Sequence, residues 1–254
     1  MIRAVVFDWF GTLAQWPHGP SSSYTSLFEQ HGYRVDPDLL NRYHARWDGV
    51  DHTEHSTSRD GYMAWTRQRL VGLAAECGVP QSERDVLVDA MVEVDQRTAM
   101  VVFPEVLSVL RELRQRGLRI GVCSNWNWDL DVVLEATAVA PLIDAAVTSA
   151  RVGYRKPHAA IYDSILTALD VTAPEALFVG DSWKPDVLGP IEVGLRTVHV
   201  WRGEGTDGLP ALVPGASRVD DLRRLLDEGF LDDAFSEDGT HSGGTRRGDT
   251  FENE

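Results

Sequence analysis

Residues 1–12, Met1-Ile-Arg-Ala-Val-Val-Phe-Asp-Trp-Phe-Gly-Thr12, carry the strongest indication of how this chain folds. The apolar run at residues 4–7 is typical of a strand that is covered on both faces of a parallel sheet. Asp8 directly follows this run, and Gly11 allows the chain to turn sharply there. In open α/β sheets ligands bind at the carboxyl ends of the strands, so Asp8 is a candidate nucleophile.

The composition limits both the size of the fold and the kinds of partner. The chain has 254 residues, 43% of them hydrophobic, which is enough for one large domain or two modest ones. Its formal net charge of -15 argues against nucleic acid and against anionic membranes as partners. No apolar stretch approaches the length of a membrane span. We expect a monomer or a homodimer that acts on a small molecule.

Cysteine usage gives an expectation about the cellular compartment. Cys77 and Cys123 are the two cysteines of the chain, which is too few for a disulfide framework. A reducing cytoplasm is therefore the expected location.

Strands and helices alternate in the second half of the sequence. Strand-like runs that end near polar residues cover 118–124, 144–149, 176–181 and 196–201. Helical patterns cover 104–116, which begins with Pro104 and ends at Gly117, and 157–169. This alternation predicts an α/β fold with a doubly wound parallel sheet.

Residues 14–100 interrupt this alternation because they contain no convincing strand. Their apolar spacing predicts four helices, over 21–31, 37–47, 59–77 and 82–100. We expect these helices to form a subdomain inserted between the first strand and the rest of the sheet. Within it, His52-Thr-Glu-His55 is interpreted as a solvated loop and not as a zinc site. Residues 231–254 are rich in Gly, Ser and charge, and are expected to be disordered.

Polar residues follow four of the predicted strands and can meet along one edge of the sheet. They are Asp8 and Thr12, Ser124 and Asn125, Lys156, and Asp181 with Asp186. A carboxylate that attacks phosphorus needs its anionic target neutralised, which Lys156, Ser124 and backbone N–H groups can do. Mg²⁺ prefers oxygen ligands such as the carboxylates of Asp8 and Asp181.

These clusters resemble, in order, the four motifs of the haloacid dehalogenase-like (HAD) hydrolase superfamily. The matching stretches are Asp8-x-Phe-Gly-Thr-Leu13, Ser124-Asn125, Lys156-Pro157 and Gly180-Asp-Ser-x-x-x-Asp186. The resemblance implies a Rossmann-like α/β core formed by residues 1–13 and 101–230. It also implies that residues 14–100 are a helical cap of the kind that these proteins insert after the first motif.

The resemblance further implies a role for each matched residue around the phosphate. Asp8 would be the nucleophile and form an aspartyl intermediate, while Lys156 would neutralise the phosphoryl group. Thr12 and Ser124 would donate hydrogen bonds to it. The candidate substrate-binding residues are Asn125 and Trp126.

The resemblance implies Mg²⁺ as the cofactor and hydrolysis of a small phosphorylated metabolite as the reaction. The metal ligands would be Asp8, the backbone carbonyl of Phe10, Asp181 and, as a further ligand or a supporting residue, Asp186.

Phe10 departs from the family pattern. Family phosphatases usually have an aspartate here, which protonates the leaving group and then activates water, and such help is worth ~10²–10⁴-fold. Three alternatives follow: a phosphatase that is slow or has an easy leaving group, a metal-independent 2-haloacid dehalogenase, or a non-catalytic HAD-like binding domain.

The fourth motif favours the phosphatase among these alternatives. Dehalogenases of this family lack the Gly-Asp pair, whereas this chain keeps Asp181 and Asp186, which would repel Asp8 without a metal. Against this, Tyr162 and Arg42 or Arg46 could match dehalogenase positions.

Overall fold

The computed structural model describes residues 1–16, 24–95, 100–203, 205 and 208–233. Its centre is a six-stranded sheet with the order β5-β4-β1-β6-β7-β8, in which all neighbouring strands are parallel. The strands are β1 (Ala4–Phe7), β4 (Arg119–Ser124), β5 (Ala145–Thr148), β6 (Ala176–Gly180), β7 (Arg196–Val200) and β8 (Ala216–Val219). The predicted doubly wound α/β fold is therefore confirmed.

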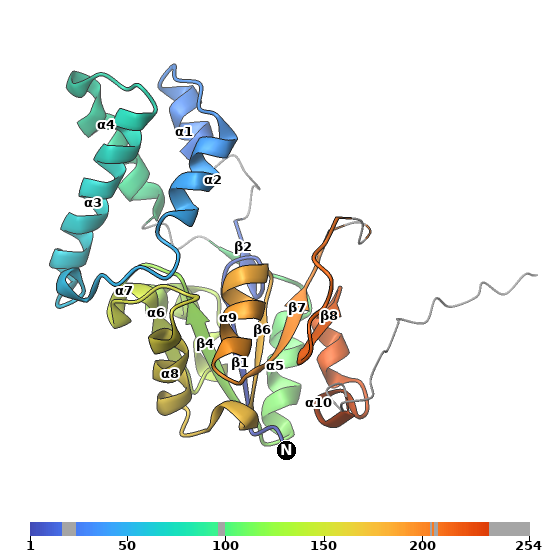
Figure 1. Cartoon of the computed structure of the whole chain (residues 1–254). Coiled ribbons are helices and arrows are strands. Elements are labelled where there is room, and N and C mark those ends of the chain that lie inside the picture. The colour runs from blue at the N-terminus through green and yellow to red at the C-terminus, as the bar shows by residue number, and fades with distance from the viewer. Residues whose placement is uncertain (17–23, 96–99, 204, 206–207, 234–254) are drawn as a thin grey trace, which may run out of the picture.

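Helices cover both faces of the sheet (Figure 1). One face packs against α5 (Val106–Gln115), α6 (Leu130–Ala136) and η6 (Leu222–Leu226). The other face packs against α8 (Ala159–Ala168). Because strand side chains alternate, Val5 and Phe7 join the first core and Ala4 and Val6 join the second. The opening apolar run is continuous because both of its faces are buried.

Four further helices lie beyond the carboxyl ends of the strands (Figure 1). They are α1 (Tyr24–Gln30), α2 (Pro37–Ala45), α3 (Arg59–Glu76) and α4 (Gln81–Asp95), with the short turn η2 (Thr53–His55) before α3. They have an apolar core of their own, which includes Phe28, Leu70 and Met91. The predicted helices are present, with ends that differ by a few residues or fall in the undescribed segments 17–23 and 96–99.

Two short strands lie where the chain leaves the sheet and returns to it. β2 (Ala14–Gln15) pairs antiparallel with β3 (Val101–Val102). The expectation that residues 14–100 contain no strand is therefore wrong at its first two residues. A two-residue strand carries no alternation that a sequence pattern can detect.

The remaining elements are short and mostly shape loops. They are η3 (Ala140–Leu142), α7 (Ser149–Val152), η4 (Ala173–Glu175), the wide π-helical turn η5 (Trp183–Leu188), α9 (Gly189–Glu192) and α10 (Phe230–Asp233). Of the tail predicted to be disordered, residues 231–233 belong to α10 and residues 234–254 lie outside the described part of the chain. None of the helices described is both long and apolar enough to cross a membrane.

Candidate active site

Asp8 lies at the centre of the sheet edge where the strands end. β1 pairs with β4 on one side and with β6 on the other, so Ser124, which ends β4, and Asp181, which directly follows β6, lie on either side of Asp8. The chain runs outward from β1 in both directions, which makes this position the topological switch point of the sheet. Asp8 is 6% exposed, and its backbone N–H donates to the carbonyl of Val179.

Lys156 joins two of the carboxylates in a buried network. Its Nζ lies 2.7 Å from Asp8 Oδ1 and 2.6 Å from Asp186 Oδ1. Burial acts to lower the pKa of the Lys156 ammonium, but the charges of Asp186 and Asp8 outweigh burial and raise it. Lys156 therefore remains a cation, as neutralisation of an anionic substrate requires.

The three aspartates lie close enough together to share a cation. Ligand oxygens of Asp8, Asp181 and Asp186 all lie within 4.8 Å of one another, and we call these residues with Lys156 the acidic cluster. Burial, and then the charge of Asp8, raise the pKa of Asp181 to about 6. Burial raises the pKa of Asp186 to about 7, although the charge of Lys156 opposes this. Three carboxylates thus share one ammonium group, and a divalent cation would complete the charge balance.

The two outer aspartates differ in how many of their oxygens are already engaged. Asp186 binds Lys156 through Oδ1 and accepts from the Ser182 N–H through Oδ2, at 3.0 Å. Asp181 accepts one long hydrogen bond, at 3.4 Å, from the Thr12 hydroxyl. The carbonyl of Phe10 accepts none of the hydrogen bonds found in the described residues. Asp181 and the Phe10 carbonyl therefore have more free acceptor capacity than Asp186.

Two glycines allow the carboxylates to approach the backbone. Gly11 has φ +84°, and a Cβ on it would collide with the carboxylate of Asp181. A Cβ on Gly180 would collide with Asp186, which the turn η5 folds back over the end of β6. The first and fourth motifs therefore contain glycine because any larger residue would collide with a carboxylate of this site.

Asn125 connects the loop after β4 to the loop that carries Lys156. Its amide accepts from the Lys156 backbone N–H at 2.7 Å and donates to the Lys156 carbonyl at 3.1 Å. This pair of bonds fixes the backbone from which the Lys156 side chain extends. The predicted phosphate ligands Thr12 and Ser124 are both buried at the same edge, with 0% and 2% of their surface exposed.

Phe10 belongs to an aromatic cluster beside the aspartates. Its ring lies 5.9 Å from that of Trp16 and stacks at 6.4 Å on that of Trp126, and these two tryptophans are 6.3 Å apart. Phe10 is 41% exposed, so its ring borders open space and does not fill the core. An apolar surface stands where a family phosphatase has its proton-transferring carboxylate.

The positions that suggested a dehalogenase have structural partners of their own. Arg46 forms a bidentate pair with Glu76 at 2.7 and 3.1 Å, and Arg42 lies 3.8 Å from Asp36, on the exposed side of the helices. The buried Tyr162 hydroxyl donates to the Pro185 carbonyl at 2.5 Å. These contacts within the protein explain why Arg42, Arg46 and Tyr162 are placed as they are, so no bound haloacid is needed to explain them.

Sequence reasoning missed several residues that hold the site from behind. His199 Nε2 bonds the Asp181 carbonyl at 2.9 Å, and Arg218 donates to the other ring nitrogen of His199. Arg202 donates to the Thr12 carbonyl and pairs with the buried Glu105 at 2.7 Å. His199 lies within a predicted strand and Arg202 directly follows it, but no motif or spacing marks either residue.

Comparison with known proteins agrees with this geometry. The family model described as haloacid dehalogenase-like hydrolase matches residues 2–194. A ribulose-1,5-bisphosphate 5-phosphatase of Halopiger xanaduensis is 25% identical over 82% of this chain and 88% of its own length. A phosphoserine phosphatase of Thermus thermophilus is 32% identical over 65% of this chain and 67% of its own length.

Solved structures show the same fold in proteins of a different name. A 2-haloacid dehalogenase of Pseudomonas syringae aligns with a TM-score of 0.59 at 24% identity, over 89% of this chain and 97% of the other. At that identity the likeness extends to the fold alone. The match over residues 2–194, together with the sheet topology, establishes the resemblance that the four motifs suggested. The chain belongs to the haloacid dehalogenase-like hydrolases.

Proposed function

We propose that this hydrolase is a Mg²⁺-dependent phosphatase that acts on a small phosphorylated metabolite through an aspartyl-phosphate on Asp8. The observation that carries the proposal is the acidic cluster, in which three carboxylates lie close together and two of them contact one buried lysine. The names of the two curated relatives, both phosphatases, support the same conclusion.

The cluster fits a hard divalent cation because its donors are oxygens and its charge is incompletely balanced. Asp8, Asp181 and the Phe10 carbonyl would hold the ion directly, with Asp186 as a further ligand or as the partner that orients Lys156. When bound, Mg²⁺ supplies positive charge against the phosphoryl oxygens. Since Asp181 has a pKa of about 6, protons would compete with the metal below that pH.

The residues of the chain would carry out two displacements at phosphorus. An Asp8 oxygen forms a bond to phosphorus while the ester bond breaks, and the leaving oxygen keeps the electron pair and takes a proton from solvent. Water then attacks the aspartyl-phosphate, which releases inorganic phosphate and restores Asp8. Lys156 offsets the charge in both steps, and helices α1–α4 would act as the cap that limits water.

Halide displacement is the second candidate, and Phe10 is the observation that favours it. Halide leaves without a proton, so an aromatic residue in place of the proton-transferring aspartate does not slow that reaction. The non-catalytic alternative rests on the same residue. The acidic cluster favours neither of them, because displacement of halide and simple binding need no third carboxylate.

One set of assays separates the candidates. Asp8→Asn should abolish release of p-nitrophenol from p-nitrophenyl phosphate while the melting temperature stays close to wild type. Asp163→Asn, on the exposed side of α8, is the matched control and should keep full activity. EDTA should stop the wild-type reaction and added Mg²⁺ should restore it.

Two results would contradict the proposal. Chloride release from 2-chloropropionate with EDTA present would identify a dehalogenase. If a folded protein shows neither activity, the non-catalytic binding domain is the remaining candidate.

A further inference from the structure

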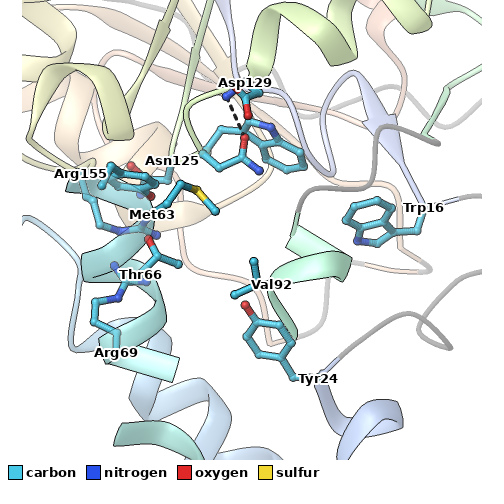
Figure 2. A pocket seen from close by; sticks show the side chains of 12 residues that line it. Trp16, Tyr24, Met63, Thr66, Arg69, Val92, Asn125, Asp129 and Arg155 are labelled. Carbon is cyan, nitrogen blue, oxygen red and sulfur yellow. Dashed lines mark hydrogen bonds between the residues drawn. The ribbon is translucent and has the colours of Figure 1, made fainter. Parts of the chain in front are cut away.

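A cavity of about 200 Å³ is lined in part by Trp126, whose ring stacks on that of Phe10, two residues after Asp8. Its lining joins helix α3 to the loops of the second and third motifs: Asn125 and Trp126 follow Ser124, and Arg155 precedes Lys156. Figure 2 shows Thr66 and Arg69 of α3 on the same side of the cavity as Arg155. We call this cavity the arginine pocket.

Buried donors without partners are concentrated in this pocket. They are Nε and Nη1 of Arg69, Nε of Arg155, Nε1 of Trp126 and the hydroxyl of Thr66, which is 7% exposed. A buried donor that binds nothing costs about 1–3 kcal/mol, and more when it is charged. Five such atoms at one cavity indicate a place that is built to receive acceptors.

The two guanidinium groups also lack a counter-ion. Arg69 packs on the rings of Trp47 and Trp65, at 4.6 and 4.3 Å, and its charge acts on Arg155. Burial lowers the pKa of Arg155, and the charge of Arg69 lowers it further. The described residues provide neither arginine with a carboxylate within ion-pair distance.

The acidic residues near the pocket do not supply the missing charge. Asp129 lines it, but both of its oxygens accept from Arg59: Oδ1 from Nε at 3.0 Å and Oδ2 from Nη2 at 2.6 Å. Asp48 interacts with Arg155 at longer range, and its own pKa is raised by burial. In a chain with a net charge of -15, two unpaired cations at one cavity are a local reversal of sign.

We propose that Arg69 and Arg155 bind a second anionic group of the substrate, a carboxylate or a second phosphate, while the scissile phosphate lies at Asp8. This inference rests on the proposed phosphatase function and specifies its substrate class. Planar guanidinium groups bind such oxyanions through paired hydrogen bonds. Trp126 and Trp16 also line the pocket, so the carbon chain between the two anions would lie along aromatic rings.

The test compares substrates that differ only in the far end. Propyl phosphate, 3-(phosphonooxy)propanoate and propane-1,3-diyl bisphosphate share one carbon chain, and their five-carbon homologues extend the reach. Wild type should favour one or both tailed substrates over the plain ester by roughly 10- to 100-fold in kcat/KM, as expected for charge-assisted hydrogen bonds. The carboxylate and bisphosphate arms identify which anion is preferred.

Variants should assign that preference to the pocket. Arg69→Gln and Arg155→Gln should each lower the ratio of tailed to plain kcat/KM by roughly tenfold. Arg69→Lys keeps the charge but not the planar guanidinium group, and it should lower this ratio less than Arg69→Gln does. The matched control is Arg67→Gln, which lies on α3 but pairs with Asp85 and Asp89 at the surface, and should leave the ratio unchanged.

The outcomes separate this inference from the phosphatase proposal. A wild-type ratio near one for both tails, or equal ratios in the Arg67 and Arg69 variants, would overturn the second anion site. If no ester is hydrolysed, the phosphatase proposal fails, and succinate in metal-free buffer then tests the pocket by itself. It should raise the melting temperature of wild type and Arg67→Gln but not of Arg69→Gln; equal shifts in all three would refute the site.

Discussion

The acidic cluster and the arginine pocket are adjacent and both charged, but they differ in how their charges are compensated. In the acidic cluster Lys156 contacts Asp8 and Asp186 directly, so much of the cost of burial is offset within the protein. In the arginine pocket Arg69 and Arg155 face each other's charge without a carboxylate partner. The paired charges of the acidic cluster stabilise the folded protein, whereas the unpaired donors of the arginine pocket remain available to bind a ligand.

Removal of Lys156 should have the largest effect, because it leaves two buried carboxylates uncompensated. Lys156→Met should lower the free energy of unfolding by about 3–5 kcal/mol at pH 8, measured by urea denaturation in EDTA. The deficit should shrink toward pH 5, since the pKa of Asp186 is already raised to about 7 and its protonation removes the repulsion.

An exposed lysine of η5, the turn that also carries Asp186, provides the control for this prediction. Lys184→Met should change the free energy of unfolding by less than about 0.5 kcal/mol. A loss below about 1 kcal/mol for Lys156→Met would show that Lys156 does not compensate the aspartates.

This difference between the clusters also separates what the sequence could predict from what it could not. Asp8 and Asp181 directly follow apolar runs, and Lys156 lies a few residues beyond another. Parallel strands bring their carboxyl ends to one edge, which predicts that these three residues meet. Arg69 and Arg155 lie 86 positions apart, on a helix and a loop, and their meeting depends on how the helices pack on the sheet. No periodicity marks such a contact.

Two smaller differences between the prediction and the structure have the same physical origin. Strand β8 was not predicted because Ala216, Ser217 and Arg218 are only half-buried at the edge of the sheet and lack an apolar run. His52, expected in a solvated loop, is 2% exposed and stacks on Trp65 at 4.6 Å. In both cases tertiary packing, which one segment cannot reveal, determines burial.

A carboxylate at position 10 should give the next largest effect, because Phe10 follows Asp8 by two residues and its ring contacts Trp16 and Trp126 of the arginine pocket. Phe10→Asp should raise kcat/KM for propyl phosphate by roughly 10- to 100-fold, since a poor leaving group gains most from protonation. The gain for p-nitrophenyl phosphate should be much smaller, because p-nitrophenolate leaves without a proton.

The non-titratable variant Phe10→Asn controls for the loss of the ring and should show no gain with either ester. An equal gain with both esters would argue that position 10 acts by space or polarity and not by proton transfer.

Neutralising an arginine of the pocket should give the smallest effect, and one of opposite sign to that of Lys156. Arg155→Gln should raise the free energy of unfolding by about 1 kcal/mol, because an unpaired buried cation beside Arg69 is removed. Arg151→Gln is the control: Arg151 pairs with Asp131 at 2.6 Å on the surface, so its loss should be neutral or slightly destabilising. Urea denaturation in chloride buffer measures both. If Arg155→Gln is less stable than Arg151→Gln, then the Arg155 charge is compensated in the free protein and the contrast between the two clusters does not hold.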